Sequence, residues 1–252
     1  MIYNAQDWAR LRNFVLAISL IAWGVILLEP RASSCCSARG AVMSWQILLA
    51  VSPPASLAID WALMLVAMMA PMLVARIYHI RISSFAWRRT RSTMLFAAGY
   101  GVIWMAAGVG IVAVELVTTE LLPRSYLPAT IMGLIAVVWQ ASPFKQRCLN
   151  RCHSHRPLAA FGIAADLDVL RLGLEQGLWC TGSCWTAMLF PMLLPAGHFV
   201  AMAAVAGLMF CERLDPPKVP AWQWRGFGTA GRCLSLWLRG PQCGPAPLTA
   251  AT

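Results

Sequence analysis

The stretch from Gly177 to His198 reads GLWCTGSCWTAMLFPMLLPAGH and combines a membrane-like composition with regularly spaced sulfur. Residues four apart lie on one face of a helix, and soft sulfur ligands are the kind that Cu(I) prefers. The stretch therefore predicts an apolar helix that could carry a metal on one side. Four sulfur-containing residues follow one another in steps of four: Cys180, Cys184, Met188 and Met192.

The composition of the whole chain predicts an all-α, polytopic membrane protein. Of its 252 residues, 59% are hydrophobic and 12% are charged, whereas about 25% are charged in soluble domains. The apolar blocks approach the roughly 20 residues that cross a bilayer. Six transmembrane helices are expected, at Asn13–Leu28, Ser56–Val74, Thr93–Val117, Leu127–Phe144, Leu172–Leu194 and His198–Cys211.

The distribution of basic residues predicts the orientation in the membrane. With the N terminus inside, the outer loops hold only Arg31, Arg39 and Arg124 of the twenty Lys and Arg residues. Lys and Arg are enriched on the cytoplasmic side of such proteins, so both termini are expected in the cytoplasm, with the chain in the bacterial inner (plasma) membrane. The net charge of +10 is then mostly explained by basic residues that stay on the cytoplasmic side and face anionic lipid headgroups. The lipid bilayer is the expected partner, and nucleic acid is not.

Three regions are expected along the chain. Residues 1–55 hold the first membrane helix, which has no cleavage site after it, and an outer connection with the pair Cys35-Cys36. Residues 56–212 form a five-helix membrane core. Residues 213–252 form a cytoplasmic tail rich in Pro, Gly and Trp, which cannot build a core of its own and is expected to be disordered.

A second stripe of sulfur lies in the second expected span, SLAIDWALMLVAMMAPML, where Asp60 is followed by Met64, Met68 and Met72 in steps of four. If this span packs against the fifth and sixth expected spans, soft and acidic ligands come together near the outer face of the membrane. The alternative is that methionine simply fills gaps in a membrane core. The expected outer cluster consists of Asp60, Met64, Met188, His198 and Met202.

Two cysteine pairs are further candidate ligands. Cys180 and Cys184 share one face of a helix, and two thiolates suit Cu(I) of low coordination number. The alternatives are that these cysteines act as small buried apolar residues, or that Gly177 and Gly182 make this stretch a packing face. Cys148 and Cys152 lie in the basic segment KQRCLNRCHSHRP, together with His153 and His155. These two thiols and two imidazoles are enough ligands for one metal ion. The alternative is that the segment is an ordinary cytosolic loop.

Three ordered motifs resemble a known family. They are DWALMLVAMMAPM at 60–72, WQASPFKQRCLNRC at 139–152, and the stretch from Gly177 with a final acidic residue at Glu212. The chain resembles a bacterial family of predicted metal-binding integral membrane proteins, whose motifs read AMM-x-P, K-x-x-CL-x-x-C and C-x-G-CCW. The resemblance covers about Ser56 to Glu212 and implies the membrane fold and metal binding. This chain departs from the motif at Ser183, which replaces the first cysteine of CCW.

The expected function is to bind and transfer or transport a soft transition metal, and copper, as Cu(I), is the metal that the sequence favours. The alternative is a non-catalytic membrane subunit or assembly factor, with a membrane-protein partner or a second copy of the chain. A thiol enzyme that uses Cys180 and Cys184 as a redox pair ranks last, because their spacing differs from the redox CxxC. The sequence has no phosphate-binding loop, nucleophile elbow or HExxH motif, so no enzymatic activity is expected.

Overall fold

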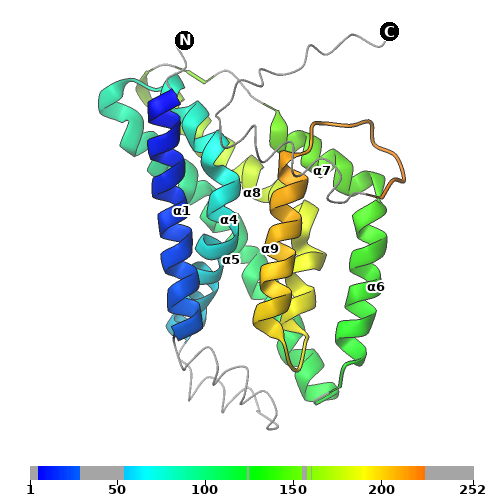
Figure 1. Ribbon diagram of the computed structural model, residues 1–252. Coiled ribbons are helices and arrows are strands. Elements are labelled where there is room, and N and C mark those ends of the chain that lie inside the picture. The colour runs from blue at the N-terminus through cyan, green and yellow to red at the C-terminus, as the bar shows by residue number, and fades with distance from the viewer. Residues whose placement is uncertain (1–4, 29–53, 124, 155–157, 160, 225–252) are drawn as a thin grey trace.

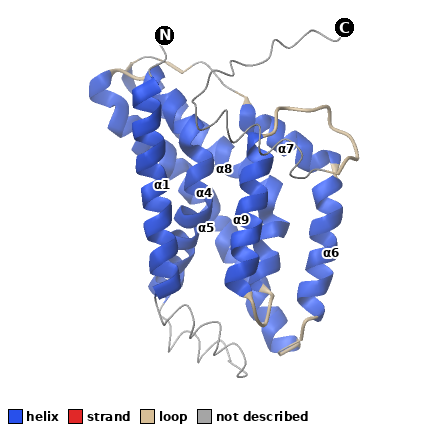
Figure 2. Ribbon diagram, in the orientation of Figure 1, coloured by secondary structure: helices blue, strands red, loops and turns tan. Residues whose placement is uncertain are grey.

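The computed structural model describes residues 5–28, 54–123, 125–154, 158–159 and 161–224, which form a bundle of helices without a strand (Figures 1 and 2). This confirms the expected all-α class. The connection at 29–53 with Cys35-Cys36, His155, and the tail from 225 lie outside the described residues. The elements are α1 (Ala5–Leu28), α4 (Pro54–Ser83), η1 (Ala86–Arg88), α5 (Arg89–Leu121), α6 (Leu127–Ala141), α7 (Pro143–His153), α8 (Gly162–Met192) and α9 (His198–Leu214).

Among the described residues, three helices are long and apolar enough to cross a membrane: α1, α4 and α5. The pair α6 and α7 adds a fourth if it counts as one bent span. The other expected spans, at α8 and α9, are not confirmed by length and composition. The second half of α8 mixes its apolar residues with Glu175, Gln176 and several Gly, Ser, Thr and Trp residues, which lowers its hydropathy, while α9 has only 17 residues.

A sharp bend separates α6 from α7, where one straight span to Phe144 was expected. Ser142 has an extended backbone (φ −70°, ψ 144°), as expected for a residue before proline. Its hydroxyl then accepts a hydrogen bond from the backbone N–H of Lys145 at 3.1 Å and caps α7. The two helices make an angle of 64°. The bend turns the basic segment, which the sequence left open as a loop, into a helix that packs on α8.

Glycines allow α5 and α8 to approach closely. A Cβ at Gly99 would lie 2.7 Å from the backbone oxygen of Leu170, and a Cβ at Gly173 would clash with the backbone oxygen of Phe96. Contacts of this kind require the absence of a side chain. A similar close approach occurs at Gly108, where the Trp61 ring lies against the glycine.

Replacing Gly99 by alanine is expected to lower the free energy of unfolding by about 1–3 kcal/mol, the usual cost of overpacking a tight contact. Gly101 is the matched control, since a Cβ there meets nothing within 4 Å. Thermal unfolding of the two variants in mild detergent measures the difference. Equal stability of Gly99→Ala and Gly101→Ala would show that the α5–α8 contact is looser than described.

At one end of the bundle, several helix ends meet. The start of α1, the end of α4, the start of α5, helix α7 and the end of α9 all lie at this end, shown at the top of Figure 1. Helix α1 packs along α4, with the Trp8 and Tyr78 rings edge to face at 5.2 Å and the Ser19 hydroxyl donating to the Ala67 carbonyl at 2.6 Å. We refer to this end, which collects most of the arginines, as the basic end.

Candidate metal centre

A single buried cluster collects sulfur from four helices. The methionine stripe of α4 and the cysteine–methionine stripe of α8 both enter it, and Met72 and Met192 pack at its edge. Both stripes therefore contribute to one buried cluster. Its fully buried sulfur-containing residues are each at most 7% exposed; they are Met64, Met68, Met69, Cys152, Cys180, Cys184, Met188, Met202 and Met209.

The Cys180 thiol accepts hydrogen bonds from two polar side chains. The Tyr100 hydroxyl donates to its Sγ at 3.4 Å, and the Arg213 guanidinium donates from Nη2 at 3.2 Å. The Cys184 thiol donates to the backbone oxygen of Cys180 at 2.8 Å, one helical turn away. Cys180 therefore faces a phenol and a cation, which is a polar setting inside an otherwise apolar cluster.

Helix α7 brings the second cysteine pair against α8. Cys152 belongs to the buried cluster, and a Cβ at Gly182 would lie 3.1 Å from the Cys148 Sγ. Burial raises the pKa of the Cys148 thiol to about 11, so this thiol is protonated at neutral pH. The two cysteine pairs, expected at different depths, thus lie next to each other. The glycine-packing alternative also holds, because Gly182 and Gly177 admit α7 and α5.

Two arginines hold α7 beside the cluster. Arg76 of α4 donates to the backbone oxygen of Cys152 and, at 2.7 Å, to that of Ser154, so it binds the carbonyls at the end of α7. Arg213 interacts with the thiols of both Cys152 and Cys180. Its Nη1 atom is buried and has no hydrogen-bond partner among the described residues. A positive charge between thiols stabilises negative charge on sulfur.

His153, which the sequence groups with the α7 cysteines, points elsewhere. Its Nδ1 lies 2.8 Å from the backbone oxygen of Leu149, and its Nε2 lies 3.0 Å from that of Arg213. Burial lowers the pKa of His153, so at neutral pH the ring is neutral and one of its nitrogens donates. The ring therefore lies between α7 and the end of α9, with its donor used on one of the two carbonyls.

A buried ion pair fastens α7 to α9 just beyond the cluster. The Lys145 ammonium lies 2.8 Å from a carboxylate oxygen of Glu212, and Gln140 donates to the same carboxylate. Lys145 is 1% exposed and Glu212 4%. These are three residues of the family motifs, and the structure shows that they meet at the bend between α6 and α7.

Replacing Lys145 by methionine is expected to cost about 3–5 kcal/mol of stability, because Glu212 is left buried without its counter-charge. The double variant Lys145→Met/Glu212→Leu is expected to recover much of the loss. The control is Lys218→Met, which breaks the exposed pair with Asp215 (3.1 Å) and should cost no more than about 1 kcal/mol. Chemical unfolding in detergent measures the stability of all three variants. Equal losses of stability in Lys145→Met and Lys218→Met would show that the buried Lys145–Glu212 pair does not stabilise the fold as proposed.

Two residues of the expected outer cluster lie apart from the sulfur. Asp60 is exposed at the far end of α4. His198 is half-buried, and its Nδ1 lies 2.8 Å from the backbone oxygen of Pro191. Neither belongs to the buried cluster.

No three His, Cys, Asp or Glu side chains in the described part of the chain lie close enough together to hold a metal as they stand. Arg213 contacts the thiols of both Cys152 and Cys180, so a cationic side chain lies beside the candidate ligands. The donor set is nevertheless soft, consisting of thiols with thioethers behind them, and this fits Cu(I) better than a hard cation.

Sequence reasoning missed three residues that surround the thiols: Tyr100, Arg76 and Arg213. In the sequence, the two arginines served only as evidence for the orientation in the membrane, and nothing distinguishes Tyr100 from other aromatic residues in apolar spans. A signal was present at Arg213, which directly follows the acidic residue of the family motif at the end of the last helix.

The comparisons with known proteins agree with the donor set. The model of the PpoB2 copper chaperone family matches residues 58–237, which is well over half of the chain and includes both cysteine pairs. No curated protein and no solved structure matches the chain. With this coverage, the chain belongs to the PpoB2 family of copper chaperones.

Proposed function

We propose that the chain is an integral membrane protein that accepts Cu(I) at the cysteines of α7 and α8 and passes it to a partner. The observation that carries the proposal is the burial of Cys152, Cys180 and Cys184 in one cluster beside Arg213. The copper chaperone family supports the choice of metal. Copper is the cargo in this account, and no catalytic step is proposed.

The binding step exchanges protons for metal. Each cysteine that binds Cu(I) loses its thiol proton, and a copper ion held by two thiolates carries one net negative charge. The Arg213 guanidinium is placed to offset that charge. In this proposal Cys180 and Cys184 supply the two thiolates, and Cys152, which lies in the same cluster, is placed to receive the ion.

The methionines supply a route to this site. Met64, Met68, Met188 and Met202 lie in the same cluster as the cysteines, and thioethers are neutral soft ligands. We propose that copper enters from the outer end near Asp60 and His198 and moves along the thioethers. It is then held by Cys180 and Cys184 and received by Cys148 and Cys152 of α7.

The proposal predicts that copper co-purifies with the chain. The full-length protein, expressed in copper-supplemented cells and isolated in mild detergent, should contain copper in stoichiometric amount by elemental analysis. A partner complex that depends on the residues after Pro216, without stoichiometric metal, would instead favour a non-catalytic assembly factor. Metal-free protein that does not take up Cu(I) under reducing conditions would overturn the copper proposal.

The proposed topology has six spans with both termini in the cytoplasm, and α8 and α9 form the last two by pairing through the turn at Pro195–Gly197. A reporter enzyme that is active only outside the cytoplasm tests this directly. Fusion after Gly197 is expected to be active, and fusion after Ser154 inactive, because lysine and arginine stay on the cytoplasmic side. The reverse pattern would contradict the orientation.

A further inference from the structure

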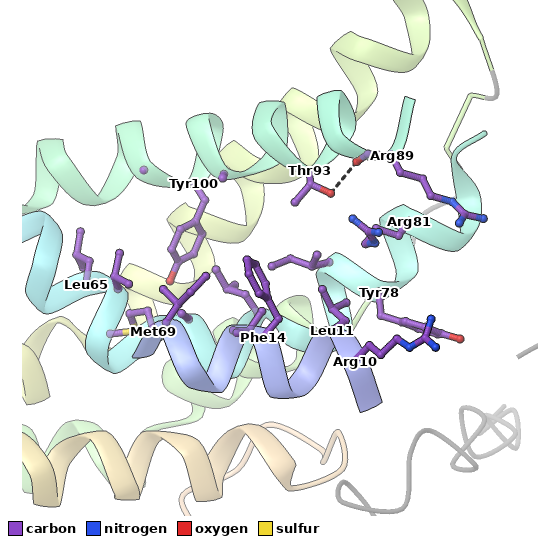
Figure 3. Close-up of a pocket in the computed structure, with 18 of the residues that line it drawn as sticks. Arg10, Leu11, Phe14, Leu65, Met69, Tyr78, Arg81, Arg89, Thr93 and Tyr100 are labelled. Carbon is purple, nitrogen blue, oxygen red and sulfur yellow. Dashed lines mark hydrogen bonds between the residues drawn. The ribbon is translucent and has the colours of Figure 1, made fainter. Parts of the chain in front are cut away.

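A cavity of about 840 Å³ lies between α1, α4 and α5, away from α7 and α9. Helices α1 and α5 form its two walls and α4 its floor, as Figure 3 shows. Its size is within the roughly 300–1,000 Å³ of small-molecule sites. Most of its lining is apolar, including Phe14 and Ile18, which are 64% and 37% exposed at its open side.

The charges of the cavity gather at one end. Arg10 of α1, Arg81 of α4 and Arg89 of α5 lie together at the basic end of the bundle, and Leu65 and Tyr100 lie at the opposite end (Figure 3). Within the described residues, these three guanidinium groups make no ion pair with a carboxylate. One acidic residue, Asp7, lines the same end. The cavity therefore joins an excess of positive charge to an apolar channel.

We propose that this cavity binds an anionic phospholipid, with its phosphate among Arg10, Arg81 and Arg89 and an acyl chain along the apolar walls. The inference rests on the proposed membrane orientation, which places the three arginines at the cytoplasmic surface. Basic pockets between membrane helices on that side bind anionic headgroups. Charge complementarity argues against a second copy of the chain, since an identical arginine cluster would repel this one.

The site is separate from the copper ligands. None of the proposed copper ligands lines the cavity, although Tyr100, which does line it, also contacts Cys180 through its hydroxyl. The arginines lie at the opposite end, so their replacement leaves the thiols untouched. Variants at the arginines are therefore expected to lose lipid binding without losing copper, and variants at the thiols the reverse.

Native mass spectrometry of the full-length protein tests the site with two probes of equal chain length, phosphatidylglycerol and phosphatidylcholine. The wild type is expected to bind the anionic lipid more tightly. Arg81→Gln/Arg89→Gln should weaken phosphatidylglycerol binding roughly 30-fold, given the usual gain per basic residue near a lipid surface. The matched control is Arg147→Gln/Arg171→Gln, two exposed arginines away from the cavity, which should bind as the wild type does.

A second variant tests the apolar part. Ala97 lines the cavity, and Ala97→Phe should reduce binding of both lipids while copper content stays the same. Equal affinity for the two lipids in the wild type, or equal loss in the arginine pair and its control, would overturn the proposal. A dimer in place of bound lipid would overturn it too. Loss of copper with lipid binding retained would count against the proposed function instead.

Discussion

Replacing Cys180 and Cys184 together by serine is expected to weaken Cu(I) binding by more than about 100-fold. Changes to outer-shell partners alone typically cost about 10–100-fold in metal affinity, and this change removes two soft ligands themselves. A hydroxyl is a hard oxygen donor that Cu(I) binds poorly. Competition with a chromophoric Cu(I) chelator, performed on reduced protein in mild detergent, measures the affinity.

The chain supplies a matched control in Cys211. This cysteine is half-buried on α9, is free, and lies outside the sulfur cluster. Cys211→Ser should leave the affinity unchanged, so a general loss of thiols is separated from loss of the site. Full Cu(I) affinity in Cys180→Ser/Cys184→Ser would show that copper is held elsewhere. Cys152→Ser alone is expected to have a smaller effect, because Cys180 and Cys184 remain.

Replacing Arg213 by methionine is expected to weaken Cu(I) binding by about 10–100-fold, in the range of outer-shell changes. Its guanidinium donates a hydrogen bond to the Cys180 sulfur at 3.2 Å. Methionine keeps much of the volume and removes the charge, so the negative copper–thiolate complex loses its counter-charge.

The conservative variant separates charge from packing. Arg213→Lys keeps the positive charge and should retain most of the affinity, whereas a purely structural role would be lost in both variants. The unfolding midpoints of the two variants report on packing independently. If Arg213→Met binds Cu(I) as tightly as the wild type does, Arg213 does not contribute to copper binding and the thiols alone form the site.

Much of the bundle was predictable because its apolar blocks are long and its glycines have a packing role. The spans near Trp61 and Gly99 were expected from composition alone, and each forms part of a longer helix. The stripes at Met64 and Cys184 meet in one cluster because a four-residue step marks one helix face.

The bend at Ser142-Pro143 and its effects were harder to predict. The polar segment after it lacks an apolar run, so only tertiary contacts show that it is a helix packed on α8. Its anchoring through Lys145 and Arg76 depends on α9 and α4, which are distant in sequence. Arg213 belongs to the site for the same reason.

X-ray absorption at the copper edge of the Cu(I)-loaded full-length protein in lipid nanodiscs tests the central claim most directly. The account predicts a first shell of sulfur alone, which is lost or replaced by lighter atoms in Cys180→Ser/Cys184→Ser and preserved in Cys211→Ser. A first shell dominated by nitrogen or oxygen in the wild type would contradict it. A sulfur shell that is unchanged in Cys180→Ser/Cys184→Ser would do the same.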